Sequence, residues 1–168
     1  MIEILFWIFL GIIFYAYLGY GLVLYLLIGY KRWRNQAGKP QIPQVDLPSV
    51  TLLVSAYNEA DHIKEKVLNS LALNYPKEKL QFLFVTDGSD DETPNIVATF
   101  PEVRLMHSPA RKGKLAAVHR AMPTVSSEVV VISDANTLLN PDAILNLVRH
   151  YGAPQVGAVS GERRVMRD

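Results

Sequence analysis

Cysteine is absent from the 168 residues of this chain. Disulfide frameworks, thiolate zinc sites and cysteine nucleophiles are therefore excluded. The chain also lacks an excess of either charge, because 17 Lys and Arg residues stand against 16 Asp and Glu residues. A balance so close to neutral gives no reason to expect nucleic acid as a partner. The length suits one domain with an appendage and excludes a large multidomain enzyme.

Two glycine-rich signatures of phosphate binding are also missing. The first expected strand, residues 50–54, is not followed by Gly-x-Gly-x-x-Gly, so the dinucleotide-binding fingerprint is absent. Gly113-Lys114 lacks the upstream glycine and the following Ser or Thr of a P-loop. Nucleotide binding would therefore have to use carboxylates, a metal ion and a lysine-bearing loop.

The N-terminal part of the chain is a long run without charge. No residue from Ile4 to Tyr30 is charged, and this run exceeds the roughly 20 residues that a helix needs to cross about 30 Å of hydrocarbon. The basic segment 31–34 follows at once and contains a tryptophan, as interfacial anchors do. We therefore predict one transmembrane helix with a basic flank over residues 1–34.

A cleaved signal peptide and a buried core helix are the alternatives to a membrane helix. A signal peptide fits poorly, because Glu3 stands where a basic region is expected and the apolar run is too long. A core helix of 27 uncharged residues is difficult to place inside so small a domain. Basic residues after the helix and Glu3 before it predict a single-pass protein of the cell membrane with its C-terminal domain in the cytoplasm.

Beyond this helix the composition changes twice. Residues 35–48 contain three prolines and one glycine without an apolar period, which predicts an extended linker. Residues 49–168 then alternate short apolar runs with amphipathic stretches. This alternation predicts an α/β fold in which a mostly parallel sheet is flanked by helices. The expected strands are residues 50–54, 82–85, 103–106, 129–132 and 156–159.

Four helices are expected between these strands. Asn58 is predicted to cap the first, Thr93-Pro94 to begin the second, and Gly113 and Asn140-Pro141 to precede the third and fourth. The strand at 129–132 is continuously apolar, which predicts a place at the buried centre of the sheet. The apolar stripes expected on the buried helix faces are residues 63, 67 and 71, residues 115, 118 and 122, and residues 144, 148 and 151.

Polar residues follow three of the expected strands at their carboxyl ends. These segments are Ser55–Glu59, Asp87–Asp91 and Asp134–Asn136. Because ligands of open parallel sheets bind beyond the carboxyl ends of strands, we expect these segments to face one site. Carboxylates gathered there would repel one another unless a cation or a hydrogen-bonding ligand lay between them. Asp90 and Asp91 are expected to shape the turn and begin the next helix.

Four segments of the chain resemble family 2 glycosyltransferases in order and spacing: Tyr57-Asn58-Glu59, Asp87-Gly88-Ser89, Gly113-Lys114 and Ser133-Asp134-Ala135-Asn136. The resemblance extends from about residue 50 to residue 161 and favours the membrane-anchored, polysaccharide-synthase-like branch. It implies a GT-A-type, Rossmann-like fold and an inverting transfer of a sugar from a nucleotide sugar, with UDP preferred. A glycan or lipid-linked acceptor and the lipid bilayer are the other implied partners.

On the nucleoside side, the resemblance assigns donor binding to Ala56, Tyr57, Glu59 and Asp87. Asp87 is expected to accept a hydrogen bond from the uracil imide, because a carboxylate is an acceptor and the imide is a donor. Two simpler interpretations stay open. Asp87 is also a common turn former, and Glu59 could simply stabilise the positive end of a helix.

On the phosphate side, the resemblance assigns diphosphate binding to Gly113 and Lys114, with a solvated basic loop as the alternative. Asp134 and Asn136 are the expected ligands of Mg²⁺ or Mn²⁺, and Asp134 is also counted among the donor-binding residues. A cap at the end of a strand is the alternative role for Asp134. Asn136 departs from a strict Asp-x-Asp pattern, because its amide can ligate a hard cation but contributes no charge.

No catalytic residue is assigned within the chain. The base that would deprotonate the acceptor is expected beyond Asp168, so this chain alone is expected to bind the donor and to transfer the sugar poorly. A membrane-anchored nucleotide-binding or assembly module is the first alternative function. A nucleotidyltransferase is the second, and it would carry a glycine-rich basic loop after the first strand, where this chain has Tyr57-Asn58-Glu59.

Overall fold

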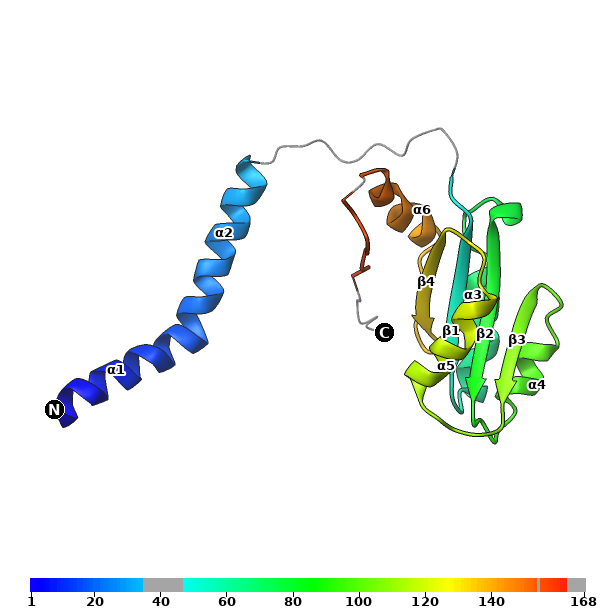
Figure 1. Cartoon of the computed structure of the whole chain (residues 1–168), viewed down its shortest axis with the longest axis horizontal. Helices are drawn as coiled ribbons and strands as arrows, with labels where there is room; N and C mark the ends of the chain where they lie inside the picture. The colour runs from blue at the N-terminus through cyan, green and yellow to red at the C-terminus, as the bar shows by residue number, and fades with distance from the viewer. Residues whose placement is uncertain (35–46, 154, 163–168) are drawn as a thin grey trace. The chain divides into compact units, whose positions relative to one another are not determined.

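The computed structural model describes residues 1–34, 47–153 and 155–162. The chain divides into two compact units, residues 1–39 and 40–168 (Figure 1). The predicted linker, residues 35–48, lies almost wholly outside the described residues.

The first unit is one helical segment with a change of winding inside it. It consists of α1 (Ile2–Phe14), the π-helical turn η1 (Tyr15–Gly19) and α2 (Tyr20–Arg34). A Cβ atom on Gly19 would lie 2.9 Å from Cδ2 of Tyr15, so the wider turn occurs where a glycine leaves room for a tyrosine ring. By length and composition, the helix Ile2–Lys31 can cross a membrane.

The second unit is built on a parallel sheet. Its four strands lie in the order β3-β2-β1-β4. Ser55 of β1 is paired with Asp134 of β4, and Asp87 of β2 with Ser108 of β3. The carboxyl ends of the strands therefore reach the same edge of the sheet, as the sequence predicts. The bounds are β1 Val50–Ala56, β2 Leu80–Asp87, β3 Val103–Ser108 and β4 Val129–Asp134.

Helices cover both faces of this sheet (Figure 1). Side chains of α3 (Ala60–Leu71), α4 (Thr93–Ala98) and α6 (Ala143–Val148) share one apolar core with alternate residues of β1. Those of α5 (Lys114–Ala121) pack on the opposite face with Leu53 and Val85. Short 3₁₀ turns complete the unit at Lys77–Lys79, Met122–Thr124 and Arg149–Gly152.

Two predictions about the strands are wrong. Residues 156–159 form no strand, and the glycine at position 157 offers no side chain to hold an extended segment against the sheet. Among the described strands, β4 lies at the edge of the sheet and not at its centre, because β1 and β2 occupy the middle. Ile132 of β4 is accordingly 53% exposed.

The predicted stripe of α5 is right for Val118, which packs against the core on this face, and wrong for the other two residues. Leu115 is 77% exposed and Met122 is exposed as well, whereas Ala117 and Ala121 are buried against the sheet. Alanine has no long side chain to hold the helix away, so α5 packs closely on the strands beneath it. The other predicted stripes hold better: Ile63, Val67, Ile144 and Val148 are buried, and Leu71 packs against the same core.

Candidate functional site

Hydrogen bonds interlock the two loops that follow β1 and β2. Asn58 has a φ of +49°, in the left-handed region, which turns its N–H group toward Oγ of Ser89 at 3.2 Å. Its side-chain Nδ2 donates to Oδ1 of Asp90 at 2.7 Å, and its Oδ1 accepts from the Asp90 N–H at 3.2 Å. Asn58 therefore joins the two loops.

The N-terminus of α3 is capped by side chains from the second loop. The N–H of Glu59 donates to Oγ1 of Thr93 at 2.9 Å, and the N–H of Ala60 donates to Oδ2 of Asp91 at 3.1 Å. The prediction that Asn58 caps this helix is wrong, because Glu59 occupies the cap position. Asp91 also accepts from the Thr93 N–H at 3.0 Å, so it shapes the turn before α4 as predicted.

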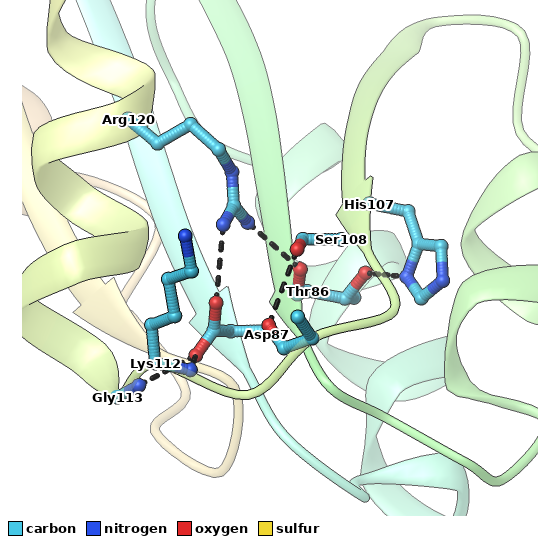
Figure 2. Close-up of polar contacts among 8 residues, drawn as sticks. Thr86, Asp87, His107, Ser108, Lys112, Gly113 and Arg120 are labelled. Carbon is cyan, nitrogen blue, oxygen red and sulfur yellow. Dashed lines mark hydrogen bonds and ion pairs between the residues drawn. The ribbon is translucent and has the colours of Figure 1, made fainter.

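Asp87 holds the loop that precedes α5. Its Oδ2 accepts from the N–H groups of Lys112 at 2.7 Å and Gly113 at 2.6 Å, and its Oδ1 accepts from Nη1 of Arg120 at 3.1 Å (Figure 2). Nη2 of Arg120 also donates to the carbonyl oxygen of Thr86 at 3.0 Å. The carboxylate is only 4% exposed, and both of its oxygens have partners within the chain. Asp87 thus fixes the backbone immediately before Lys114.

These contacts also fix the charge of Asp87. Burial alone would raise its pKa, but the hydrogen bonds from Lys112, Arg120 and Gly113 outweigh burial and hold the pKa below its ordinary value. Asp87 is therefore a carboxylate at neutral pH. Sequence reasoning missed Arg120 as its counterion. Recognition of a nucleobase by Asp87 stays a prediction.

Gly88 lets the loop before α5 approach the end of β2 closely. Its φ is +73°, and a Cβ atom at this position would lie 2.4 Å from Cβ and 2.7 Å from Cα of Arg111. Cζ of Arg111 in turn lies 3.8 Å from the ring centroid of Tyr57, a distance typical of cation–π contacts. The close approach at Gly88 therefore brings the loop before α5 beside the loop after β1.

Replacement of Gly88 by alanine should consequently displace this loop. We expect Gly88→Ala to lower the free energy of unfolding by about 2 kcal/mol or more, because left-handed backbone strain adds to a collision with the backbone of Arg111. Urea unfolding of the full chain in detergent would measure this. Gly157→Ala is the control and should change stability by less than about 0.5 kcal/mol, since its Cβ would meet nothing within 4 Å. Equal stability of the two variants would contradict the prediction.

Lys114 and Asp134 are the two predicted site residues whose side chains form an ion pair. Lys114 is the first residue of α5 and Asp134 is the last residue of β4, and Nζ of the lysine forms an ion pair with Oδ1 of the carboxylate. Their side chains are 56% and 44% exposed. A cation and an anion thus stand together, open to solvent, at the carboxyl edge of the sheet.

The donor atoms near Asp134 fit a hard divalent cation. Asp134 already accepts a cationic group, and the amide of exposed Asn136 lies two residues later. Oxygen atoms of this kind are the ligands that Mg²⁺ and Mn²⁺ take. Within the described residues there is no group of three or more His, Cys, Asp or Glu side chains able to hold a metal. An ion bound here would therefore need further oxygen ligands, such as those of a diphosphate.

The predicted site residues are gathered to different degrees. Tyr57 contacts the loop that Asp87 fixes, and Gly113 of that loop leads directly to the pair formed by Lys114 and Asp134. Ala56, the last residue of β1, is buried in the core that β1 shares with α3, and Glu59 contributes its backbone N–H to the contact with Thr93. The roles predicted for these residues in donor binding stay predictions.

Comparison with known proteins assigns the chain to a family. The sequence model of the family described as glycosyl transferase family 2 matches residues 51–168. The chain belongs to glycosyltransferase family 2. Its parallel sheet flanked by helices is the GT-A type of α/β fold, as the sequence predicts.

The curated relatives of this family 2 chain include polysaccharide synthases. It is 30% identical over 131 residues to the poly-beta-1,6-N-acetyl-D-glucosamine synthase of Staphylococcus aureus, a match that covers 76% of this chain and 31% of that synthase. The synthase of the same name from Staphylococcus epidermidis is 27% identical over 150 residues, covering 86% of this chain and 35% of the relative. The chain spans about a third of the length of these relatives.

Solved structures resemble the family 2 chain as well. The mannosyltransferase PcManGT from Pyrobaculum calidifontis, in complex with GDP-Man and Mn²⁺, has a TM-score of 0.75 at 35% identity; the match covers 89% of this chain and 45% of that protein. S. aureus TarS 1–349 in complex with UDP-GlcNAc has a TM-score of 0.53 at 22% identity, covering 58% of this chain and 29% of TarS. The second likeness shows a common fold.

Proposed function

We propose that this chain is the donor-binding part of a membrane-bound inverting glycosyltransferase, which binds a nucleotide sugar and a divalent cation at the carboxyl edge of its sheet. The observation that carries the proposal is the exposed pair of Lys114 and Asp134 at that edge. A nucleoside diphosphate with its cation carries both a negative and a positive charge. Lys114 could therefore exchange Asp134 for the diphosphate, and Asp134 could exchange Lys114 for the cation.

Each side of the pair has a proposed task. Asp134 and Asn136 would hold Mg²⁺ or Mn²⁺, and a bound cation would neutralise the negative charge of the diphosphate leaving group. Lys114 would donate hydrogen bonds to phosphate oxygens, because its ammonium group carries three donors on a flexible stem. Asp87 would keep the backbone before Lys114 in place through its bonds to Lys112 and Gly113.

The nucleoside would bind beside Tyr57 and Arg111. The guanidinium group of Arg111 lies over the ring of Tyr57, and both flat groups offer a face on which a base can stack. A base held there would lie near Glu59 and above Ala56. We propose a UDP-sugar as donor. The mannosyltransferase in complex with GDP-Man makes a GDP-sugar the second donor to test.

The helix Ile2–Lys31 would anchor the enzyme in the cell membrane, with the second unit in the cytoplasm. Nucleotide sugars are charged and do not cross lipid, so a cytoplasmic domain would meet the donor where it is made. A glycan or a lipid-linked saccharide would be the acceptor. The base that deprotonates this acceptor is expected beyond Asp168.

Titration of nucleotide sugars tests the proposal. The full chain in detergent would be titrated calorimetrically with UDP-GlcNAc and with GDP-Man, each in Mn²⁺ and in EDTA. We expect binding of one donor that Mn²⁺ strengthens at least about tenfold. Identical affinities with and without the ion, or no binding of either donor, would refute the proposal. Slow release of the sugar from the bound donor would favour an enzyme, and binding without release would favour an assembly module.

A further inference from the structure

Two side chains of α3 hold the segment that follows β4. Nζ of Lys66 donates to Oγ of Ser133 at 2.7 Å and to the carbonyl oxygen of Thr137. Three residues later along the helix, Nδ2 of Asn69 donates to the carbonyl oxygen of Leu139 at 2.8 Å, and its Oδ1 accepts from the N–H of the same residue at 2.9 Å. Four hydrogen bonds thus join one helix to a segment about 70 residues away in the chain.

Lys66 is an unexpected residue at its position. Its side chain is fully buried, although lysine is among the residues least often buried in proteins. Burial lowers the pKa of Lys66 to about 8, while the negative charge of Asp134 acts in the opposite direction. Apolar residues of similar volume often serve stability as well as a buried charge or better. The lysine therefore requires an explanation other than core packing.

The contacts of Lys66 bracket the proposed cation ligands. Only Asp134, Ala135 and Asn136 lie between its two partners, Ser133 and Thr137. Ala135 is 2% exposed and points into the protein, whereas its two neighbours reach solvent. A bond of 3.3 Å from the N–H of Thr137 to the carbonyl oxygen of Asp134 closes this turn. Both oxygen-bearing side chains are thereby presented on one short arch, residues 133–137.

We propose that Lys66, which binds both ends of the arch, is a positioning residue that holds it so that Asp134 and Asn136 ligate one divalent cation together. Asn69 supports the arch from Leu139, two residues beyond its end. The inference rests on the proposed function, because it concerns the same cation site. Without the hydrogen bonds from Lys66 and Asn69 the arch could relax, and Asp134 and Asn136 would have to be ordered when the ion binds. That ordering would weaken the affinity for the cation while leaving the rest of the nucleotide site intact.

Lys66→Met and Asn69→Leu test this role. Methionine has nearly the volume of lysine, and leucine has the branched shape of asparagine with a larger volume, so neither substitution opens a cavity. Asn74→Ala is the control, because Asn74 lies three residues after α3 and its Nδ2 also crosses to the segment before α6. It donates there to Oδ1 of Asp142 at 2.9 Å, five residues beyond the arch. Circular dichroism of each full-length variant in detergent would establish that it is folded.

Two quantities are measured. Electron paramagnetic resonance gives the affinity for Mn²⁺ in the presence of UDP or GDP, and calorimetry gives the nucleotide affinity in EDTA. We expect Lys66→Met and Asn69→Leu to weaken Mn²⁺ binding by about tenfold to a hundredfold and to leave affinity in EDTA unchanged, with Asn74→Ala like the wild type. If Lys66→Met does not fold, the same result with Asn69→Leu supports the proposal.

The outcomes separate this inference from the function on which it rests. A wild-type chain that binds no nucleotide with Mn²⁺ would refute the proposed function. A wild-type chain that does so, beside Lys66→Met and Asn69→Leu variants of unchanged Mn²⁺ affinity, would refute the positioning role alone. Equal losses in Mn²⁺ and in EDTA would refute it too, because they would indicate general damage to the nucleotide site.

Discussion

Asp134→Ala is expected to weaken Mn²⁺-dependent binding of UDP or GDP about a hundredfold, which corresponds to about 2.7 kcal/mol. The substitution removes the one charged ligand that the chain is proposed to supply to the ion and leaves the neutral amide of Asn136. It also frees Lys114 from its ion pair. We therefore expect nucleotide affinity in EDTA to stay the same or to rise slightly, because the ammonium group no longer has to leave a carboxylate.

The different effects on nucleotide affinity in Mn²⁺ and in EDTA distinguish the role of Asp134 from that of its neighbours. Lys114→Met should weaken nucleotide binding in Mn²⁺ and in EDTA alike, since the lysine is proposed to contact phosphate in both. Asp142→Ala is the control, because Asp142 is an exposed carboxylate in the same connection before α6. Calorimetric titration of the three variants would decide. Asp134→Ala with wild-type affinity in Mn²⁺ would remove Asp134 from the cation site.

Asp87→Ala is expected to have the largest effect on stability, a loss of about 3 kcal/mol in the free energy of unfolding. The substitution removes three hydrogen bonds at once. It leaves the guanidinium group of Arg120, whose side chain is 30% exposed, without its carboxylate. It also releases the backbone of Lys112 and Gly113, so the loop before Lys114 should lose its fixed position. Urea unfolding of the full chain in detergent would measure the loss.

The pH dependence of this effect has a definite sign. Because the folded state lowers the pKa of Asp87, its stabilising contribution is present above the unfolded value, about 4, and is lost as the pH falls through the folded value. The stability difference between the wild type and Asp87→Asn, which keeps the size of the side chain, should therefore shrink below pH 4. A difference that stays constant to pH 3, or an Asp87→Ala variant as stable as the wild type, would contradict this account.

The sheet and its functional edge follow from local sequence patterns. Runs of apolar residues predict β1 to β4, and the rule that parallel strands end at one edge predicts that the segments after β1, β2 and β4 lie at the same edge. The ion pair between Lys114 and Asp134 was not predicted. The prediction of a fifth strand at residues 156–159 is wrong. Its sequence, Val-Gly-Ala-Val, resembles a strand, but no described strand pairs with it. The stripe of α5 failed at Leu115 and Met122 because large residues were favoured over Ala117, although close packing on a sheet requires small ones.

The residues that support the site were harder to predict. Arg120 and Asn69 are helical polar residues, which normally face solvent, and their partners lie 33 to 70 residues away. Lys66 did carry a signal. It stands three residues after Ile63 and one before Val67, on the face of α3 that the apolar stripe marks as buried. A charged residue in such a stripe indicates that a polar partner is buried with it. The sequence does not identify that partner, because tertiary contacts determine it.

The contacts between the loops after β1 and β2 have a consequence for how the protein can adapt to a ligand. The segment after β2 caps the helix that begins after the first loop, so neither can move far without exposing the amide groups of Glu59 and Ala60. They behave as one rigid wall. The stretch between β3 and α5 is held differently, by the carboxylate of Asp87 and by the contact of Arg111 with Tyr57. Differences in nucleotide size between related enzymes would accordingly be absorbed on that side, and chimeras that exchange one of the two interlocked loops alone should fold poorly.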